Sequence, residues 1–157
     1  MKKTILLIGL VLGGFLMGSA NAQIRVSLGI NISSQPVWGP TGYDHAEYYY
    51  MPDIDVFYYV PQHQYIYQSQ GRWIFSSNLP YRYHSFDMYT GYKVVINDKR
   101  PYQRADVYRR QYATYKGNHE QEVIRNSHDS KYFQVKGHPE YDNWRRNNNN
   151  NNGHRHH

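Results

Sequence analysis

Tyrosine constrains the fold of this chain more than any other residue type. The 157 residues include 18 Tyr, against 5 Phe and 3 Trp. Tyrosine has a high strand propensity, and its ring can be buried while its hydroxyl reaches water or a polar partner. A small sheet can therefore carry tyrosine on a half-exposed face without presenting a purely apolar surface. The tyrosine content favours a β-rich domain whose core consists largely of phenol rings.

Short segments rich in aromatic and β-branched residues are expected to form strands, because Pro, Gly or polar turns separate them. These segments are 48–50, 55–59, 65–68, 72–75 and 93–97. Gly71 supplies the positive φ that a short hairpin loop commonly needs. A further strand is expected over 23–33, where apolar and polar residues alternate. The tight connections predict an antiparallel meander.

A helix is expected after the strands. Pro101 suits a first helical turn, and Gly117 suits the position just after a helix. Between them a stripe with a helical period consists of Ala105, Tyr108, Tyr112 and Tyr115. We expect this stripe to pack on the sheet. The predicted fold class is mainly β (α+β): a small antiparallel meander sheet with one C-terminal amphipathic helix and a disordered tail.

The N-terminus has the pattern of a secretory signal peptide. Lys2 and Lys3 precede an uncharged apolar run over 5–17, and Ala20-Asn21-Ala22 forms a cleavage site. The run is shorter than the ~20 residues that span a bilayer, so no transmembrane segment is expected after cleavage. The predicted organisation is a signal peptide (1–22), a compact Tyr-rich domain (23–117) and a flexible, basic, Asn/His-rich tail (118–157).

Export and the lack of cysteine exclude several classes of function. A chain destined for the periplasm, the cell surface or the medium does not meet cytosolic nucleotides or genomic DNA, so nucleic acid is not an expected partner. With 0 Cys, the chain has no disulfides, thiolate metal sites, cysteine nucleophiles or lipoprotein anchor. No cofactor is expected. Loss of Lys2 and Lys3 on cleavage lowers the formal net charge from +6 to +4.

Several segments resemble a group of small secreted Tyr-rich proteins of Bacteroidota. They are 35–44, 48–55, Gly71-Arg72-Trp73, Leu79-Pro80 and 91–97, and the resemblance covers about 24–117. That group has no assigned activity. The resemblance implies secretion and a compact Tyr-rich body, and it transfers no functional residues.

Rings and cations alternate in Tyr81-Arg82-Tyr83, which predicts a binding surface together with Trp38 and Trp73. Such surfaces stack on flat ligands and pair with anions. Outside the cytoplasm, the matching partners are envelope polysaccharide and anionic lipid. The alternative is that the tyrosines only build the core while the arginine solubilises its rim.

Two further groups of residues support rival functions. Asp53 and Asp55 would share one face of a strand and, with Asp44, suggest a carbohydrate-active hydrolase; the alternative is that Pro52-Asp53 forms a turn. His154, His156 and His157 suggest a metal-handling tail, or incidental affinity for metal. The primary prediction is a non-enzymatic, exported, envelope-associated binding or structural protein. Its ligand and oligomeric state stay open.

Overall fold

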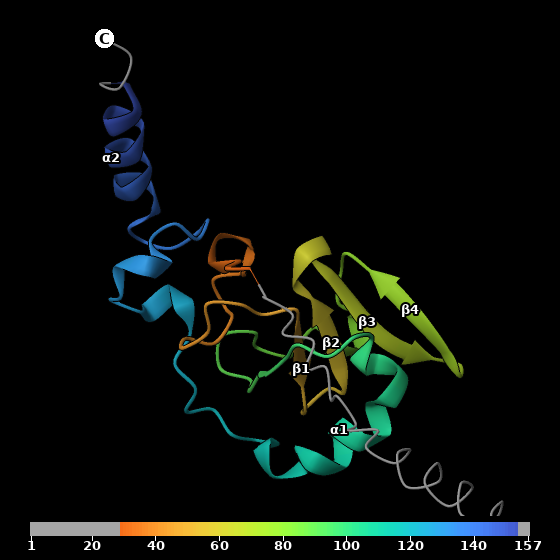
Figure 1. The fold of residues 1–157 in the computed structure, drawn as a ribbon. Helices are drawn as coiled ribbons and strands as arrows, with labels where there is room; N and C mark the ends of the chain where they lie inside the picture. The colour runs from red at the N-terminus through yellow and green to blue at the C-terminus, as the bar shows by residue number, and fades with distance from the viewer. Residues whose placement is uncertain (1–28, 154–157) are drawn as a thin grey trace, which may run out of the picture.

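The structure is a computed structural model that describes residues 29–153. Five strands form one antiparallel sheet in the order β4-β3-β2-β1-β5 (Figure 1). They are β1 (Tyr48–Met51), β2 (Val56–Tyr59), β3 (Gln64–Ser69), β4 (Arg72–Ser76) and β5 (Val94–Ile96). The first four strands form a meander, and β5 returns to the free side of β1. The predicted antiparallel sheet and the mainly β class are confirmed.

The hairpin between β3 and β4 forms as expected. Its loop consists of Gln70 and Gly71, whose φ angles are 50° and 73°. Two consecutive positive φ angles are characteristic of a type I′ turn, whose twist matches that of the flanking strands. The loop fixes the register of the hairpin, in which Ser69 is opposite Arg72.

The expected helix covers one face of the sheet. It consists of a 3-10 turn η4 (Pro101–Arg104), the helix α1 (Ala105–Gln111) and a second 3-10 turn η5 (Ala113–Tyr115). Tyr108 contacts Phe57 of β2 edge to face, at 5.9 Å between ring centroids. Gly117 follows the helical segment with a φ of 71°. Ala105, Tyr108 and Tyr112 of the predicted stripe therefore pack on the sheet, as expected, whereas Tyr115 at its end stacks on Tyr92.

Loops cover the other face of the sheet. The indole of Trp38 packs edge to face on Tyr49 and Tyr58, at centroid separations of 5.7 and 4.8 Å. Four partly buried side chains from the segment between β4 and β5 pack on the same face: Leu79, Tyr83, Phe86 and Met88. Both faces of β1 are consequently covered, and all four of its residues are buried.

Two fully buried tyrosines keep their hydroxyls hydrogen-bonded. Tyr49 and Tyr50 are 0% exposed. The Tyr49 hydroxyl donates to Gln35 Oε1 at 2.8 Å, and the Tyr50 hydroxyl donates to Asp55 Oδ1 at 3.0 Å. Burial raises the pKa of both phenols, because ionisation would place a charge in the core. Tyrosine thus forms core on both faces of the sheet without leaving these hydroxyls unpaired.

The prediction of a strand over 23–33 is wrong for residues 29–33, the part of this segment that the structure describes. Residues 1–28, including the predicted signal peptide, lie outside the described part, and Ile32–Ser34 form a 3-10 turn, η1. The side chain of Asn31 accepts from the Ala46 N–H at 2.9 Å and donates to the Ala46 carbonyl at 2.8 Å. This side-chain pairing takes the place of a backbone ladder and turns the chain at Ile32.

The compact domain continues well past the boundary expected at residue 117. Val123 forms a bridge with Pro40, and the N–H of Ile124 donates to the Gly39 carbonyl at 2.8 Å. Farther on, the buried side chains of Tyr132 and Val135 pack with Ile124 and with Ile32 near the start of the domain. The backbone pairing of residues 122–125 with loop 37–41 brings these apolar residues together. In the sequence they are too scattered to indicate a core.

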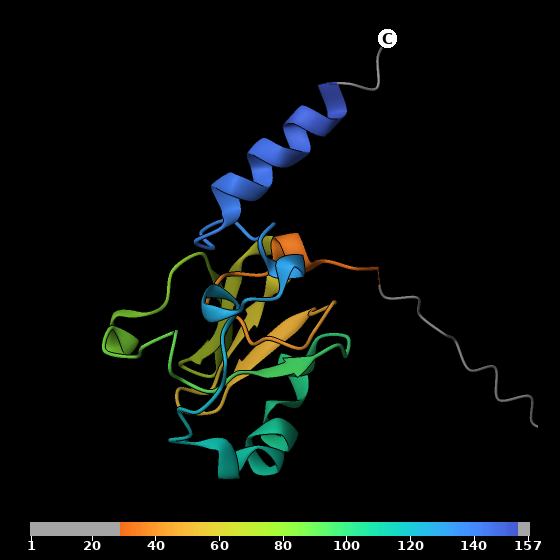
Figure 2. The ribbon, with the colours of Figure 1, turned by 90° about the vertical axis from the view of Figure 1, so that its left-hand side faces the viewer.

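The last described element also differs from the expected flexible tail. Residues 141–153 form the helix α2 (Tyr141–Gly153), which projects away from the body of the molecule in Figures 1 and 2. The remaining short 3-10 turns are η2 (Val60–Gln62), η3 (Tyr81–Tyr83), η6 (Ile124–Asn126) and η7 (Ser130–Tyr132). No helix among residues 29–153 combines the length and apolar character needed to cross a membrane.

Lys93, immediately before β5, is a buried cation. It is 1% exposed, and its ammonium donates to the Met88 carbonyl at 2.8 Å. Burial lowers the pKa of Lys93 from 10.5 to about 8, and the nearby Asp87 carboxylate partly opposes this shift. The buried, protonated Lys93 therefore lowers the stability of the folded state at neutral pH.

We expect the free energy of unfolding of the natural chain to rise with pH relative to a Lys93→Met variant. Above about pH 8 the folded lysine loses its proton while the unfolded lysine keeps it, so stability increases up to the unfolded pKa of 10.5. At about 1.4 kcal/mol per unit, the gain between about pH 8 and about pH 9.5 is about 1–2 kcal/mol. Urea titrations of both chains at several pH values measure this gain. The same change in the free energy of unfolding with pH in both chains would contradict the prediction.

Candidate functional site

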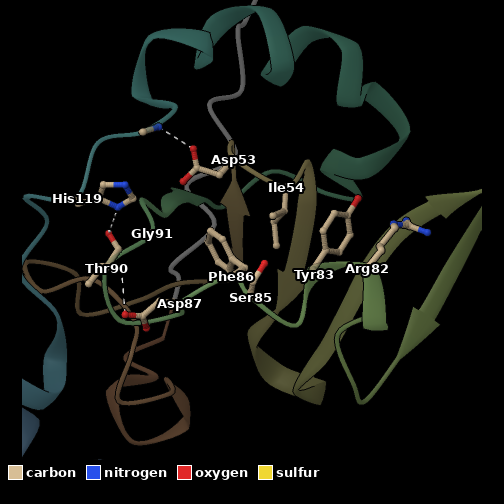
Figure 3. Close-up of a pocket in the computed structure, with 11 residues that line it drawn as sticks. Asp53, Ile54, Arg82, Tyr83, Ser85, Phe86, Asp87, Thr90, Gly91 and His119 are labelled. Carbon is tan, nitrogen blue, oxygen red and sulfur yellow. Dashed lines mark hydrogen bonds between the residues drawn. The ribbon is translucent and has the colours of Figure 1, made fainter.

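An open hollow of about 380 Å³ lies where the β1–β2 turn, loop 82–91 and residues 117–119 meet (Figure 3). We call it the groove. Its lining residues are Asp53, Ile54, Arg82, Tyr83, Ser85, Phe86, Asp87, Thr90, Gly91, Gly117 and His119. A neighbouring hollow shares Gly117 and His119 with it and extends the concave surface toward Glu120. Segments far apart in the sequence therefore form one polar and aromatic surface.

Asp53 and Asp55 do not share one face of a strand. Both lie in the turn between β1 and β2, as expected from the alternative reading of Pro52-Asp53. Asp53 Oδ1 accepts from the Gly117 N–H at 2.7 Å and lines the groove. Asp55 has a φ of 53° and accepts from Arg109 at 2.6 Å, so it is not part of the groove lining.

Three polar residues form the wall opposite the apolar floor of the groove. The Asp87 carboxylate accepts from the Tyr89 N–H at 2.8 Å and from the Thr90 hydroxyl at 3.2 Å. The Thr90 carbonyl lies 3.3 Å from His119 Nδ1. Because a carbonyl oxygen only accepts, a hydrogen bond here is donated by Nδ1. The wall thus offers the Asp87 carboxylate, the Thr90 hydroxyl and the His119 imidazole to a ligand.

The floor is formed by Ile54 and the rings of Tyr83 and Phe86. Gly91 lies against Phe86 so closely that a Cβ atom would be 2.2 Å from the ring carbon Cζ. Any larger residue at this position would have to displace the ring. Glycine at position 91 therefore allows the loop to pass behind Phe86 and keeps the ring at the floor.

The predicted residues Tyr81, Arg82 and Tyr83 stand together on η3, at one end of the groove. The Arg82 guanidinium lies over the Tyr83 ring, 4.7 Å from its centroid, and also contacts Tyr67 at 5.4 Å. Tyr81 is 85% exposed and stacks on His84 at 4.7 Å. This arrangement presents a cation and an exposed ring side by side.

The other predicted residues lie elsewhere. Trp38 is partly buried between its own loop and the sheet, and Trp73 packs against Phe57 and Tyr102 on the helix-covered face. His154, His156 and His157 fall outside the described residues. Within residues 29–153, no group of three or more His, Asp or Glu side chains is arranged to hold a metal ion.

Sequence reasoning missed His119, Asp87 and Thr90 as site residues. No motif links them, because Asp53 and His119 are brought together by the return of the chain after α1. The neighbouring Gly91 and Gly117 are the local indication of a site here, since glycines commonly mark positions where the backbone turns or approaches another group closely.

The fold and the groove define a small, mainly β protein with one sheet covered on both faces and an open polar–aromatic groove at its side. No family model, curated protein or solved structure with which the chain was compared matches it.

Proposed function

We propose that this chain is an exported, non-enzymatic glycan-binding protein of the cell envelope, and that the groove is its binding site. The proposal depends on one observation: planar rings, carboxylates and hydrogen-bond donors, both cationic and neutral, line the same groove. Sugars offer an apolar C–H face and a rim of hydroxyls, which such surfaces complement. The hollow of about 380 Å³ is within the usual range for small-ligand sites.

Each part of the groove has a role in this proposal. Tyr83 and Phe86 supply ring surface for stacking against a sugar face. Asp53 and Asp87 accept from hydroxyls, and Arg82 donates to hydroxyls or to an acidic group of the glycan. The predicted signal peptide supports exposure of the site to envelope polysaccharide rather than to cytosolic ligands.

A carbohydrate-active hydrolase is the second candidate, because two carboxylates line the same groove. The candidate pair is Asp53 with Asp87, since Asp55 is bonded to Arg109 outside the groove. This candidate differs from the binding proposal in one measurable respect: a hydrolase releases soluble sugar with time, and a binding protein does not.

We expect the exported chain to sediment with insoluble cell-wall glycan at both about 0.1 M and about 1 M salt. Raising the salt shortens the screening length from ~10 to ~3 Å and removes long-range attraction, while contacts within the groove persist. A Ser85→Trp substitution, at an exposed position on the rim, is expected to weaken binding at least tenfold, or about 1.4 kcal/mol. Ser77→Trp, exposed outside the groove, is the matched control and is expected to bind normally.

Equal loss of binding in both variants, or no sedimentation of the natural chain, would contradict the proposal. Release of soluble sugar that disappears in an Asp53→Asn variant would instead favour the hydrolase. Binding only at low salt would point to general attraction by basic residues.

A further inference from the structure

The two edge strands of the sheet differ in what covers them. Beside the first residue of β5, the Gln121 carboxamide bonds to both the N–H and the carbonyl of Lys93, each at 2.9 Å. Along β4, no hydrogen bond from another described residue reaches the outward backbone groups of Trp73 and Phe75. β4 also contains neither Pro nor Lys, which commonly protect an exposed edge. β4 is therefore the edge open to a further strand.

The register of the hairpin decides which backbone groups of β4 point outward. Ser69 and Arg72 flank the two-residue loop and form a hydrogen-bonded pair. Such pairs alternate with non-hydrogen-bonded pairs along an antiparallel ladder. Arg72, Ile74 and Ser76 therefore direct their N–H and carbonyl groups toward β3. Trp73 and Phe75 direct theirs away from the sheet.

This outward pattern is complementary to itself. If two copies of β4 meet antiparallel about a two-fold axis at Ile74, Trp73 of one copy is opposite Phe75 of the other. The outward groups of these two residues then form hydrogen-bonded pairs. Ile74 faces Ile74 in the closer, non-hydrogen-bonded spacing, and Arg72 faces Ser76, so no like charges are directly opposed.

The side chains favour the same arrangement. Phe75 is 50% exposed, and its ring contacts Tyr102 at 5.3 Å between centroids. Trp73 contacts the same Tyr102 ring at 5.6 Å. Tyr102 thus holds both rings on one face of β4. Pairing would place each Phe75 beside a Trp73 of the second copy and cover the exposed ring.

We propose that this protein forms a symmetric dimer in which β4 pairs antiparallel with β4 of a second copy, with Ile74 on the two-fold axis. The contact is isologous, so it closes with two copies and leaves no strand edge of the same kind at the junction. A junction of one short strand is small by the standards of stable interfaces, and the dimer is consequently weak and reversible.

An Ile74→Cys variant of the exported chain tests the register directly, because the natural chain has no cysteine. The Cα atoms of opposed residues in a non-hydrogen-bonded pair are about 4.5 Å apart, which permits a disulfide. Mild oxidation is expected to yield a covalent dimer. In an Arg72→Cys control, the two cysteines are four positions out of register, roughly 13 Å apart, and no rapid cross-link is expected. Equal cross-linking in both variants would overturn the proposal.

Sedimentation equilibrium of the uncross-linked chain provides the second measurement. Phe75→Lys places a charge on the open edge and is expected to raise the dimer dissociation constant at least tenfold. Val107→Lys, which changes an exposed apolar residue of α1, is the matched control and is expected to leave the dissociation constant unchanged.

Three outcomes of these measurements would overturn the proposal. The first is a monomer at every concentration. The second is an equal response of the Phe75→Lys and Val107→Lys variants. The third is a monomer whose Trp73 and Phe75 amides are protected from hydrogen exchange, which would indicate that another segment of the same chain occupies the edge.

Discussion

A chain that ends at Gly117 is expected to lose its cooperative fold. It lacks Val123, Ile124, Tyr132 and Val135, all of which are no more than 2% exposed. Burial of such side chains contributes about 1.5–3 kcal/mol each. Their combined contribution is comparable with the whole stability of a typical domain, about 5–15 kcal/mol. Loop 37–41 also loses the backbone partners that the 122–125 segment provides.

Circular dichroism during urea titration measures this effect. The natural chain is expected to show one cooperative transition, and the chain ending at Gly117 none. The control is a chain ending at Trp144, which removes most of the projecting helix α2 and keeps the segment that packs on the body. That control is expected to unfold near the natural midpoint. An unchanged midpoint in the Gly117 truncation would show that residues 118–144, which the control retains, are dispensable for folding.

Tyr49→Ala is expected to destabilise the fold by about 3–5 kcal/mol, the range for removing a large buried aromatic side chain. Tyr49 is 0% exposed and contacts Trp38 and Tyr58. The packing at this ring is tight, because a Cβ on neighbouring Gly39 would be 2.7 Å from the Tyr49 hydroxyl oxygen. Alanine would remove these contacts and leave a cavity in the core.

A Tyr49→Phe variant measures the contribution of the hydroxyl apart from that of the ring. It keeps the packing and leaves Gln35 Oε1 without its donor in a buried position, at an expected cost of about 1–3 kcal/mol. Tyr81→Ala is the control, because Tyr81 is 85% exposed, and its effect is expected to stay within about 0.5 kcal/mol. Urea midpoints of the three variants test the order. A Tyr49→Phe variant as stable as the natural chain would show that the hydroxyl contributes nothing net.

Local patterns predicted most of the sheet and its helix. The five strand segments from Tyr48 onward, the Gly71 turn and the helical stripe that begins at Ala105 depend on periodicity and turn chemistry within a few residues, and the structure has these strands, the turn and a helix there. The same rules gave a wrong strand near Ile32, where the Asn31 side chain competes with backbone pairing. Local rules do not include a side chain that binds a distant backbone.

The site was only partly predictable. The Tyr81-Arg82-Tyr83 run stands out because its members are adjacent, and they share η3. Asp87 and His119 carry no motif. They reach the groove because the chain returns past the β1–β2 turn, where Asp53 accepts from the Gly117 N–H.

The amino-acid sequence by itself determined the five strands and the helix that follows β5, because strand and helix periods and glycine turns are properties of neighbouring residues. Tertiary structure alone decided three further features. It brought residues 122–135 into the core, it assembled the groove from three separate segments, and it left β4 as the open edge. Each depends on contacts between residues far apart in the chain, and their free energy is gained only when loops of different origin pack together.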